Sequence, residues 1–341
     1  MSYQIFIFLA VFNSAFNLHP NPEKTLPKTD NIIFKTSDGG TTWDDVSAGL
    51  PQKFDAWSIF ASKEEVLLGH EKGIFSARTF SSTPQWQKEI YLKESVSVII
   101  PGQSGPYAGS YNERFFQKMS GTGVWIPVYT SLHGKTVRTI FEAKNGHVFV
   151  GCENGILKSR DKGKTWQMVF NDGMITSFLE KDNVLLAGTS KGIIRSIDDG
   201  KQWVPVLTED GPTKSIKIID DQLIAISFGI RSQKDIDENT NTESNTIRTS
   251  DDKGKTWKTT YKNLSPFHYM YKMEDKQSPI RIINDIEATD KYIFCSIEKG
   301  VFRSDDHGKS WELVLPCGEN TLFDLAVSGN VVYAVKVFRG C

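Results

Sequence analysis

The chain has 341 residues, of which 39% are hydrophobic and 11% aromatic, and its formal net charge is −1. This composition allows a large buried core and excludes a disordered polymer. Because 40 basic residues are balanced by 41 acidic ones, overall charge gives no basis for binding nucleic acid or an anionic membrane, and we expect neither as a partner.

Residues 1–30 are expected to form a segment of their own in front of one domain, residues 31–341. Ile5 to Phe12 is an apolar run with the length of a secretory h-region, and it is too short to cross a bilayer. No Lys or Arg precedes it, and Gln4 to Phe8 resembles a later strand-like run, Gln222 to Ile226. Two interpretations stay open: a signal peptide of a secreted or periplasmic protein, or an extra strand of a protein that stays in the cytoplasm.

One eight-residue pattern recurs along the chain: Ser or Thr, any residue, Asp, any residue, Gly, any residue, then Thr, Ser or Gln, and Trp. Its five copies are Thr36 to Trp43, Ser159 to Trp166, Ser196 to Trp203, Ser250 to Trp257 and Ser304 to Trp311. An Asp that accepts hydrogen bonds from the following backbone and a Gly two residues later predict a tight turn between two strands. We therefore interpret the five aspartates as structural. They are Asp38, Asp161, Asp198, Asp252 and Asp306.

The tryptophans mark a repeat. Trp43, Trp86, Trp125, Trp166, Trp203, Trp257 and Trp311 are separated by 43, 39, 41, 37, 54 and 54 residues, and only Trp57 falls outside the series. This spacing is typical of four-stranded propeller blades. Two copies of the pattern, Arg78 to Trp86 and Lys118 to Trp125, have lost the Asp, so their turns are expected to close differently.

The repeated pattern resembles the Asp-box, or BNR, repeat of β-propellers. The resemblance implies an all-β fold with seven four-stranded antiparallel blades and the boxes between the third and fourth strands. The best-defined period predicts strands at Met174 to Leu179, Asn183 to Gly188, Gly192 to Ser196 and Gln202 to Leu207. Strands at the two ends of the chain, near Asn31 and near Val331, are expected to pair and complete the seventh blade.

Two insertions explain the long periods, namely Arg231 to Asn245 and Tyr261 to Ser278. Both are expected on the face opposite the boxes, where binding loops of a rigid scaffold often lie. The second insertion holds Phe267, His268, Tyr269 and Tyr271, which either bind a partner or cover the central channel. Further partner-binding candidates are Trp57, Arg138 and Arg281, which are expected at the start of inner strands. Trp57 either faces the channel or fills the space between blades.

The resemblance also extends to sialidases and sortilins, and a sialidase would need three arginines around the sugar carboxylate. The first arginine of the chain is Arg78, after the first box, and only Arg138 and Arg281 are well placed. We therefore predict no catalytic residues. The chain looks like the non-enzymatic photosystem II stability/assembly factor-like members, which implies a monomeric scaffold that binds a protein or a glycan. A sialidase-like glycoside hydrolase acting in the channel stays open as the alternative.

No metal ion or cofactor is expected. The four cysteines lack the spacing of a zinc site. Cys152 and Cys295 lie in apolar strands and are predicted to be inert and buried, whereas Cys317 and Cys341 are candidates for a disulfide on one face.

Overall fold

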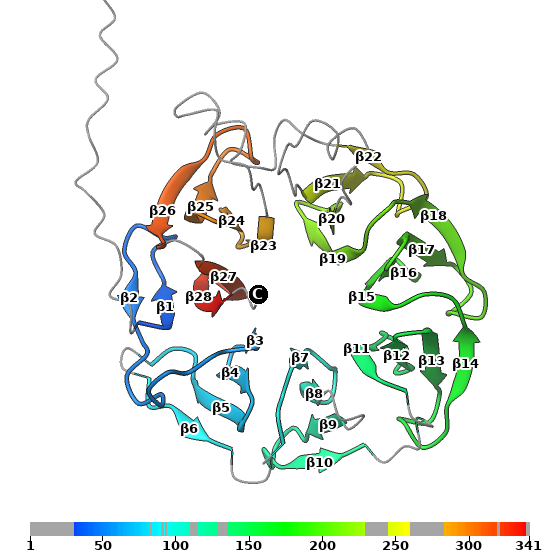
Figure 1. Ribbon diagram of the computed structural model, residues 1–341, viewed down its shortest axis with the longest axis horizontal. Coiled ribbons are helices and arrows are strands. Elements are labelled where there is room, and N and C mark those ends of the chain that lie inside the picture. Colours follow the sequence, from blue (N-terminus) through cyan, green and yellow to red (C-terminus); the bar gives the residue numbers. More distant parts are fainter. Residues whose placement is uncertain are drawn as a thin grey trace, which may run out of the picture.

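The protein is a ring of seven four-stranded antiparallel sheets, as the sequence predicts (Figure 1). The computed structural model describes residues 31–81, 84–89, 92, 94–109, 115–128, 132, 135–228, 245–259, 283–318 and 321–338. Within these ranges, no helix has the length and apolar character that crossing a membrane requires.

Strands A to D of each blade run from the innermost to the outermost position. Blades 1 to 3 are β3 (Ser58–Ala61), β4 (Glu65–His70), β5 (Gly73–Arg78) and β6 (Gln87–Lys88); β7 (Val98–Ile100), β8 (Tyr107–Gly109), β9 (Phe115–Lys118) and β10 (Trp125–Pro127); and β11 (Val137–Glu142), β12 (Val148–Cys152), β13 (Gly155–Ser159) and β14 (Gln167–Phe170). Blades 4 to 6 are β15 (Ile175–Lys181), β16 (Val184–Thr189), β17 (Gly192–Ser196) and β18 (Val204–Thr208); β19 (Thr213–Ile219), β20 (Gln222–Phe228), β21 (Asn245–Ser250) and β22 (Lys258–Thr259); and β23 (Ile283–Ala288), β24 (Ile293–Ile297), β25 (Gly300–Ser304) and β26 (Glu312–Pro316). Blade 7 is β27 (Thr321–Ser328), β28 (Val331–Phe338), β1 (Ile33–Thr36) and β2 (Asp44–Asp45).

Blade 7 joins the two ends of the chain, which confirms the predicted closure (Figure 1). Strands β1 and β28 are antiparallel, with Ile33 opposite Val335 and Thr36 opposite Val332. The run that begins at Val337 also resembles the start of a third strand in the sequence, but it continues β28 and pairs with β27. The ring therefore closes without stagger, and both inner strands of blade 7 come from the C-terminal end.

Each intact box closes its own turn through its Asp, as predicted. In blade 6, Ser304 Oγ donates to Asp306 Oδ1 at 2.9 Å, and Gly308 N donates to Ser304 Oγ at 2.7 Å. The backbone and side chain of Ser310 donate to the two oxygens of Asp306 at 2.8 and 2.7 Å. Gly308 has φ +81°, where a side chain would be strained. Trp311 then donates from Nε1 to Gly308 O at 3.0 Å, so the ring starts the fourth strand in a fixed orientation.

Asp306→Ala is expected to destabilise the protein by about 1–2 kcal/mol at pH 7, because the turn loses its only side-chain acceptor for Ser310. Hydrogen bonds from Ser310 lower the pKa of Asp306 to about 2. Its contribution is therefore present above the ordinary carboxyl pKa and is lost as the pH falls through the folded value. In denaturant titrations, the deficit of the variant should shrink between pH 5 and pH 2. A deficit that stays constant over this range would contradict the role of the ionised carboxylate.

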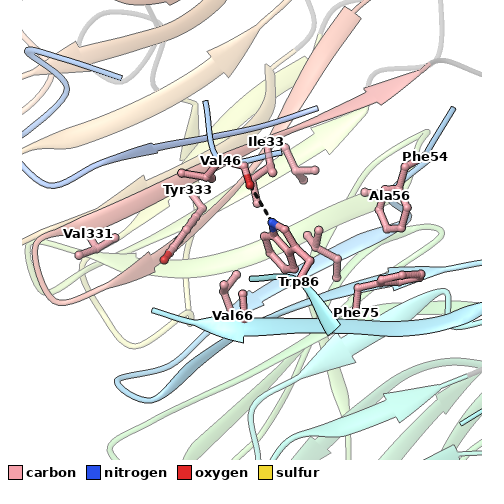
Figure 2. Packing of buried hydrophobic residues seen from close by; sticks show 12 residues of the cluster. Ile33, Val46, Phe54, Ala56, Val66, Phe75, Trp86, Val331 and Tyr333 are labelled. Carbon is pink, nitrogen blue, oxygen red and sulfur yellow. Dashed lines mark hydrogen bonds between the residues drawn. The ribbon is translucent and has the colours of Figure 1, made fainter. Parts of the chain in front are cut away.

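The two eroded boxes use other contacts, as expected from the missing Asp. In blade 2, Met119 N donates to Val124 O at 2.9 Å and Gly123 N donates to Met119 O at 3.0 Å, which closes the turn through the backbone. In blade 1, Trp86 donates from Nε1 to Val46 O at 2.7 Å (Figure 2). Trp86 thereby packs in a cluster with Ile33 and Tyr333 of blade 7. The tryptophan is kept because it fills the space between blades, even where the Asp is lost.

A basic residue at the end of several third strands fastens one blade to the next. Lys35, Lys158, Arg195 and Arg303 each donate to a backbone carbonyl in the third-to-fourth-strand turn of the following blade. In the sequence Lys158, Arg195 and Arg303 each follow a Gly and two apolar residues, whereas Lys35 follows an Asn and three apolar residues. The structure shows that this Lys or Arg is a contact between blades, which the sequence alone did not reveal.

Lys158→Met is expected to cost about 1–3 kcal/mol, because it leaves the partly buried Asp199 without its ammonium partner. The Lys158 side chain is only 2% exposed, and its Nζ lies 2.6 Å from Asp199 Oδ2. The matched control is Lys181→Met, which removes a similar pair with Asp221, whose side chain is 93% exposed. The control should cost less than about 1 kcal/mol. Equal losses in chemical unfolding would contradict this account.

Candidate functional site

The antiparallel blades divide the connections between two faces. Turns from A to B and from C to D emerge on one face, which carries the boxes and is called the box face. Connections from B to C and from D to the next A emerge on the other, the insertion face. Residues 229–244 join β20 to β21 and residues 260–282 join β22 to β23, so both attach on the insertion face, as predicted. Asn245, predicted to end the first insertion, is instead the first residue of β21.

Six inner strands begin with a β-bulge on the insertion face. In blades 3 to 6 the register with strand B shifts by one residue at this point. In blades 1 and 2, two successive residues face one glycine of strand B, Gly69 or Gly109. The extra residues form what we call the bulge ring: Trp57, Ser97, Arg138, Thr176, Lys214 and Asn284. Bulges re-aim a side chain and are frequent next to functional sites.

Two residues predicted from the sequence, Trp57 and Arg138, belong to this ring. They occupy equivalent positions in blades 1 and 3, so blade 2 separates them. Trp57 is 40% exposed. Arg138 forms an ion pair with Glu153 through one terminal nitrogen, and its Nε is buried without a hydrogen-bonding partner in the described part of the chain. The other predicted partner-binding residues lie outside the described residues: Phe267, His268, Tyr269, Tyr271 and Arg281.

A connected set of polar side chains crosses the inner strands of blades 5, 6 and 7, and we call it the inner-strand network. Lys217 Nζ lies 2.5 Å from Asp285 Oδ1 and 2.7 Å from Glu287 Oε1. Lys214 Nζ donates to Asn284 O at 2.5 Å and to Asn284 Oδ1 at 2.9 Å. The network therefore links β19 to β23 through two lysines.

The network continues from β23 to β27. Asn284 Nδ2 donates to Asp324 Oδ1 at 2.7 Å and to Phe323 O at 2.8 Å, and Leu325 N donates to Asp285 Oδ2 at 3.0 Å. One face of the inner strands is thus polar in three neighbouring blades.

The carboxyl groups of this network differ in acidity. Burial raises the pKa of Glu287, and Asp285 raises it further, which outweighs the opposite effect of Lys217. Burial likewise raises the pKa of Asp324, which Asp285 reinforces and Lys214 opposes. For Lys217, burial acts to lower the pKa, but the charges of Asp285 and Glu287 raise it. The lysine is therefore firmly charged, whereas Glu287 and Asp324 are weaker acids than ordinary carboxyl groups.

The resemblance to sialidases implies a nucleophilic tyrosine with a glutamate partner, and one tyrosine and one glutamate do meet in the structure. Tyr107 OH lies 3.4 Å from Glu142 Oε2, and Tyr107 is 3% exposed. Burial and the charge of Glu142 raise the pKa of Tyr107. A nucleophilic tyrosine requires the opposite shift, since its anion must form.

The box face carries a hollow of about 650 Å³ between blades 4, 5 and 6. Its charged residues pair with one another across the blades. Lys253 Nζ lies 3.1 Å from Asp182, and His307 Nδ1 lies 2.5 Å from Asp220 Oδ2. Among the described residues, no group of three or more His, Cys, Asp or Glu side chains has the geometry to hold a metal ion. The hollow is lined by contacts that join blades.

The described cysteines are free thiols. Cys152 and Cys295 are fully buried, and burial raises the pKa of both, to about 11 for Cys152. Cys317 is half-buried and donates from Sγ to Thr321 O at 3.2 Å, while burial raises its pKa to about 11. Cys341 lies outside the described residues, so the disulfide with Cys317 stays a prediction.

Sequence reasoning missed most of the bulge ring and all of the inner-strand network. The sequence did contain a signal for the ring. In blades 1 to 4, each ring residue directly precedes the residue that faces a glycine of strand B. In blade 4, for example, Thr176 precedes Ser177, which faces Gly188. Aligning the inner strands on that glycine would have placed Ser97 and Thr176 beside Trp57 and Arg138.

Comparison with known families agrees with the geometry of the boxes. Residues 302–313, which span the box of blade 6, match the family model of the BNR/Asp-box repeat. The chain is therefore a seven-bladed β-propeller with Asp-box turns. No curated protein sequence matches this propeller.

Solved structures resemble the Asp-box propeller in fold. YCF48 bound to D1 peptide is 14% identical, with a TM-score of 0.55 over 85% of this chain and 94% of the other. The computationally designed Ika8 protein is 12% identical, with a TM-score of 0.50 over 84% and 98% of the two chains. An ancestral GH74 enzyme is 13% identical, with a TM-score of 0.52 over 83% of this chain and 48% of the other. At these identities the likeness shows the fold alone.

Proposed function

We propose that this Asp-box propeller is a non-catalytic scaffold that binds a protein segment on its insertion face, around the bulge ring. The observation that carries the proposal is a contrast between equivalent positions. The boxes repeat Asp and Gly in five blades, whereas the bulge ring has a different residue in each of its six blades. Positions that a fold requires are alike in every repeat, so positions that differ are available for recognition.

The chemistry of the ring suits a protein partner. Trp57 supplies an exposed aromatic surface, and Arg138 supplies a guanidinium group that is already partly dehydrated. Aromatic and Arg side chains contribute much of the binding energy at protein interfaces. The likeness in fold to YCF48, which was solved with a bound D1 peptide, supports a protein segment over a glycan.

Site-specific photo-crosslinking tests the proposal. A photoreactive amino acid in place of Trp57 or Ser97 reports on the bulge ring, and one in place of Lys201 or Lys309 reports on the box face. In extracts of the source organism, we expect one discrete protein adduct from both ring positions and none from the box face. Adducts from the box-face positions alone would reject the proposed surface, and adducts to glycans alone would replace the protein partner by a carbohydrate.

A glycoside hydrolase is the second candidate, and one observation favours it. Asp285 and Glu287 both contact Lys217 Nζ, so their nearest oxygens are at most about 5 Å apart, close to the carboxyl separation in retaining hydrolases. The raised pKa of Glu287 would suit a general acid. Screening with chromogenic glycosides decides between the candidates. Turnover that Glu287→Gln abolishes, in a variant with an unchanged unfolding midpoint, would establish the enzyme.

A further inference from the structure

The inner-strand network holds more carboxyl groups than ammonium groups. Asp285 and Glu287 share Lys217, whereas Lys214 donates to the amide and carbonyl oxygens of Asn284. Asp324 accepts its hydrogen bond from the neutral amide of Asn284. One carboxyl group is therefore in excess over the two lysines, and it lies beside another carboxylate in a partly buried wall.

Neighbouring elements do not supply the missing charge within the described part of the chain. On the flanking inner strands, β3 carries no charged residue, whereas β15 carries Glu180, which accepts from Lys144 N, and Lys181, which pairs with Asp221. On β28, Lys336 extends over the ring of Phe34, with Nζ 5.6 Å from the ring centre. Binding a proton is thus the way of neutralising the excess carboxylate that costs the least free energy.

We propose that the inner-strand network is a proton-operated fastening between blades 5, 6 and 7: one proton, held on Asp324 or Glu287, keeps these blades tightly joined, and its loss loosens the contact of β23 with β27. The raised pKa of both groups agrees with this geometry. An acid whose pKa is higher in the folded state contributes stability that is present below its unfolded pKa and lost as the pH rises through the folded value.

The contact of β23 with β27 joins the blade that closes the ring to a strand that begins on the insertion face. Strand β27 belongs to the blade that closes the ring, and β23 directly follows residues 260–282 on the insertion face. Ionisation places two like charges, Asp285 and Asp324, on the two strands that meet there. The box aspartates change stability with pH in the opposite direction: their pKa values are lowered in the folded state, so their contribution to stability increases as the pH rises. The Asp-box turns therefore lose stability as the pH falls, whereas the contact of β23 with β27 loses stability as the pH rises.

Asp324→Asn tests the proposal, because its amide imitates the protonated carboxyl group and still accepts from Asn284. We expect equal unfolding midpoints for variant and wild type at pH 5. At pH 8 the midpoint of the variant should be higher by at least about 2 °C. Asp172→Asn is the control: this exposed residue pairs with Lys191, and its midpoint should differ from that of wild type by the same amount at both pH values.

Hydrogen exchange adds a local readout at Leu325 N, which donates to Asp285. After correction for the intrinsic rate, exchange at pH 8 should be about tenfold faster in wild type than in the variant. The proposal would be overturned if the midpoints of variant and wild type differed by the same amount at pH 5 and pH 8 and the exchange rates at Leu325 N were equal. Should the variant misfold, carboxyl-carbon NMR of the wild type decides: a titration above pH 5 for Glu287 or Asp324 supports the fastening, and ordinary titration of both near pH 4 rejects it.

Discussion

Ala334→Pro is expected to prevent stable closure of the ring, with a loss of at least about 3 kcal/mol. Ala334 is fully buried and lies in β28, opposite Phe34 of β1 on one side and Leu325 of β27 on the other. Proline removes a backbone donor there and forces its ring between paired strands. Because β1 belongs to the N-terminal end of the chain, the loss should open the ring between its two ends. Chemical unfolding followed by tryptophan fluorescence measures the effect.

A second proline separates closure from a general intolerance of proline in strands. Lys88 lies on the outer strand β6, and Glu89 N donates inward to Ile74 O. Backbone donors alternate along a strand, so Lys88 N points outward to solvent. Lys88→Pro should therefore cost less than about 1 kcal/mol. If Ala334→Pro unfolds at the same denaturant concentration as Lys88→Pro, the joined blade 7 is not what holds the ring.

Trp86→Ala is expected to cost about 3–5 kcal/mol, although its box has lost the Asp. Trp86 is 7% exposed and packs between blades 7 and 1, where its Nε1 donates to Val46 O (Figure 2). Removing the ring leaves a cavity at the junction of the closing blade with its neighbour.

Trp57 provides the matched control, because it is the one tryptophan outside the repeat. Trp57→Ala should cost less than about 1 kcal/mol, since the side chain is 40% exposed and its backbone contact to Gly69 remains. Equal losses for the two alanine variants in equilibrium unfolding would contradict the distinction between scaffold and surface tryptophans.

Much of the fold could be predicted because each box is a local structure. The Asp, the Gly and the Trp lie within eight residues, and their hydrogen bonds join residues two to four positions apart, as in Ser304, Asp306 and Ser310. A short pattern of this kind can be identified without any knowledge of the rest of the chain. The closure followed from counting strands, since an open sheet edge near Asn31 needed a partner near Val331.

The functional surface was harder to predict because it depends on contacts between blades. Trp57 and Arg138 stood out by residue type, but their equivalence becomes visible only when the inner strands are aligned on the glycine of strand B that faces the bulge. Lys217 and Glu287 are 70 residues apart and look like ordinary strand residues in the sequence. Likewise, the sequence shows a basic residue before several boxes, such as Lys158, but its role as a contact between blades depends on its partner Asp199 in the next blade.

The central claim is that repeated positions build the scaffold and that the varied bulge ring recognises the partner. The most direct measurement compares two double variants for binding of the crosslinked partner and for thermal unfolding. Trp57→Ala with Arg138→Ala should lower affinity at least about tenfold and leave the unfolding midpoint nearly unchanged, whereas Asp161→Ala with Asp306→Ala should lower the midpoint and retain the affinity. Loss of affinity in the box variant, together with full affinity in the ring variant, would contradict the account.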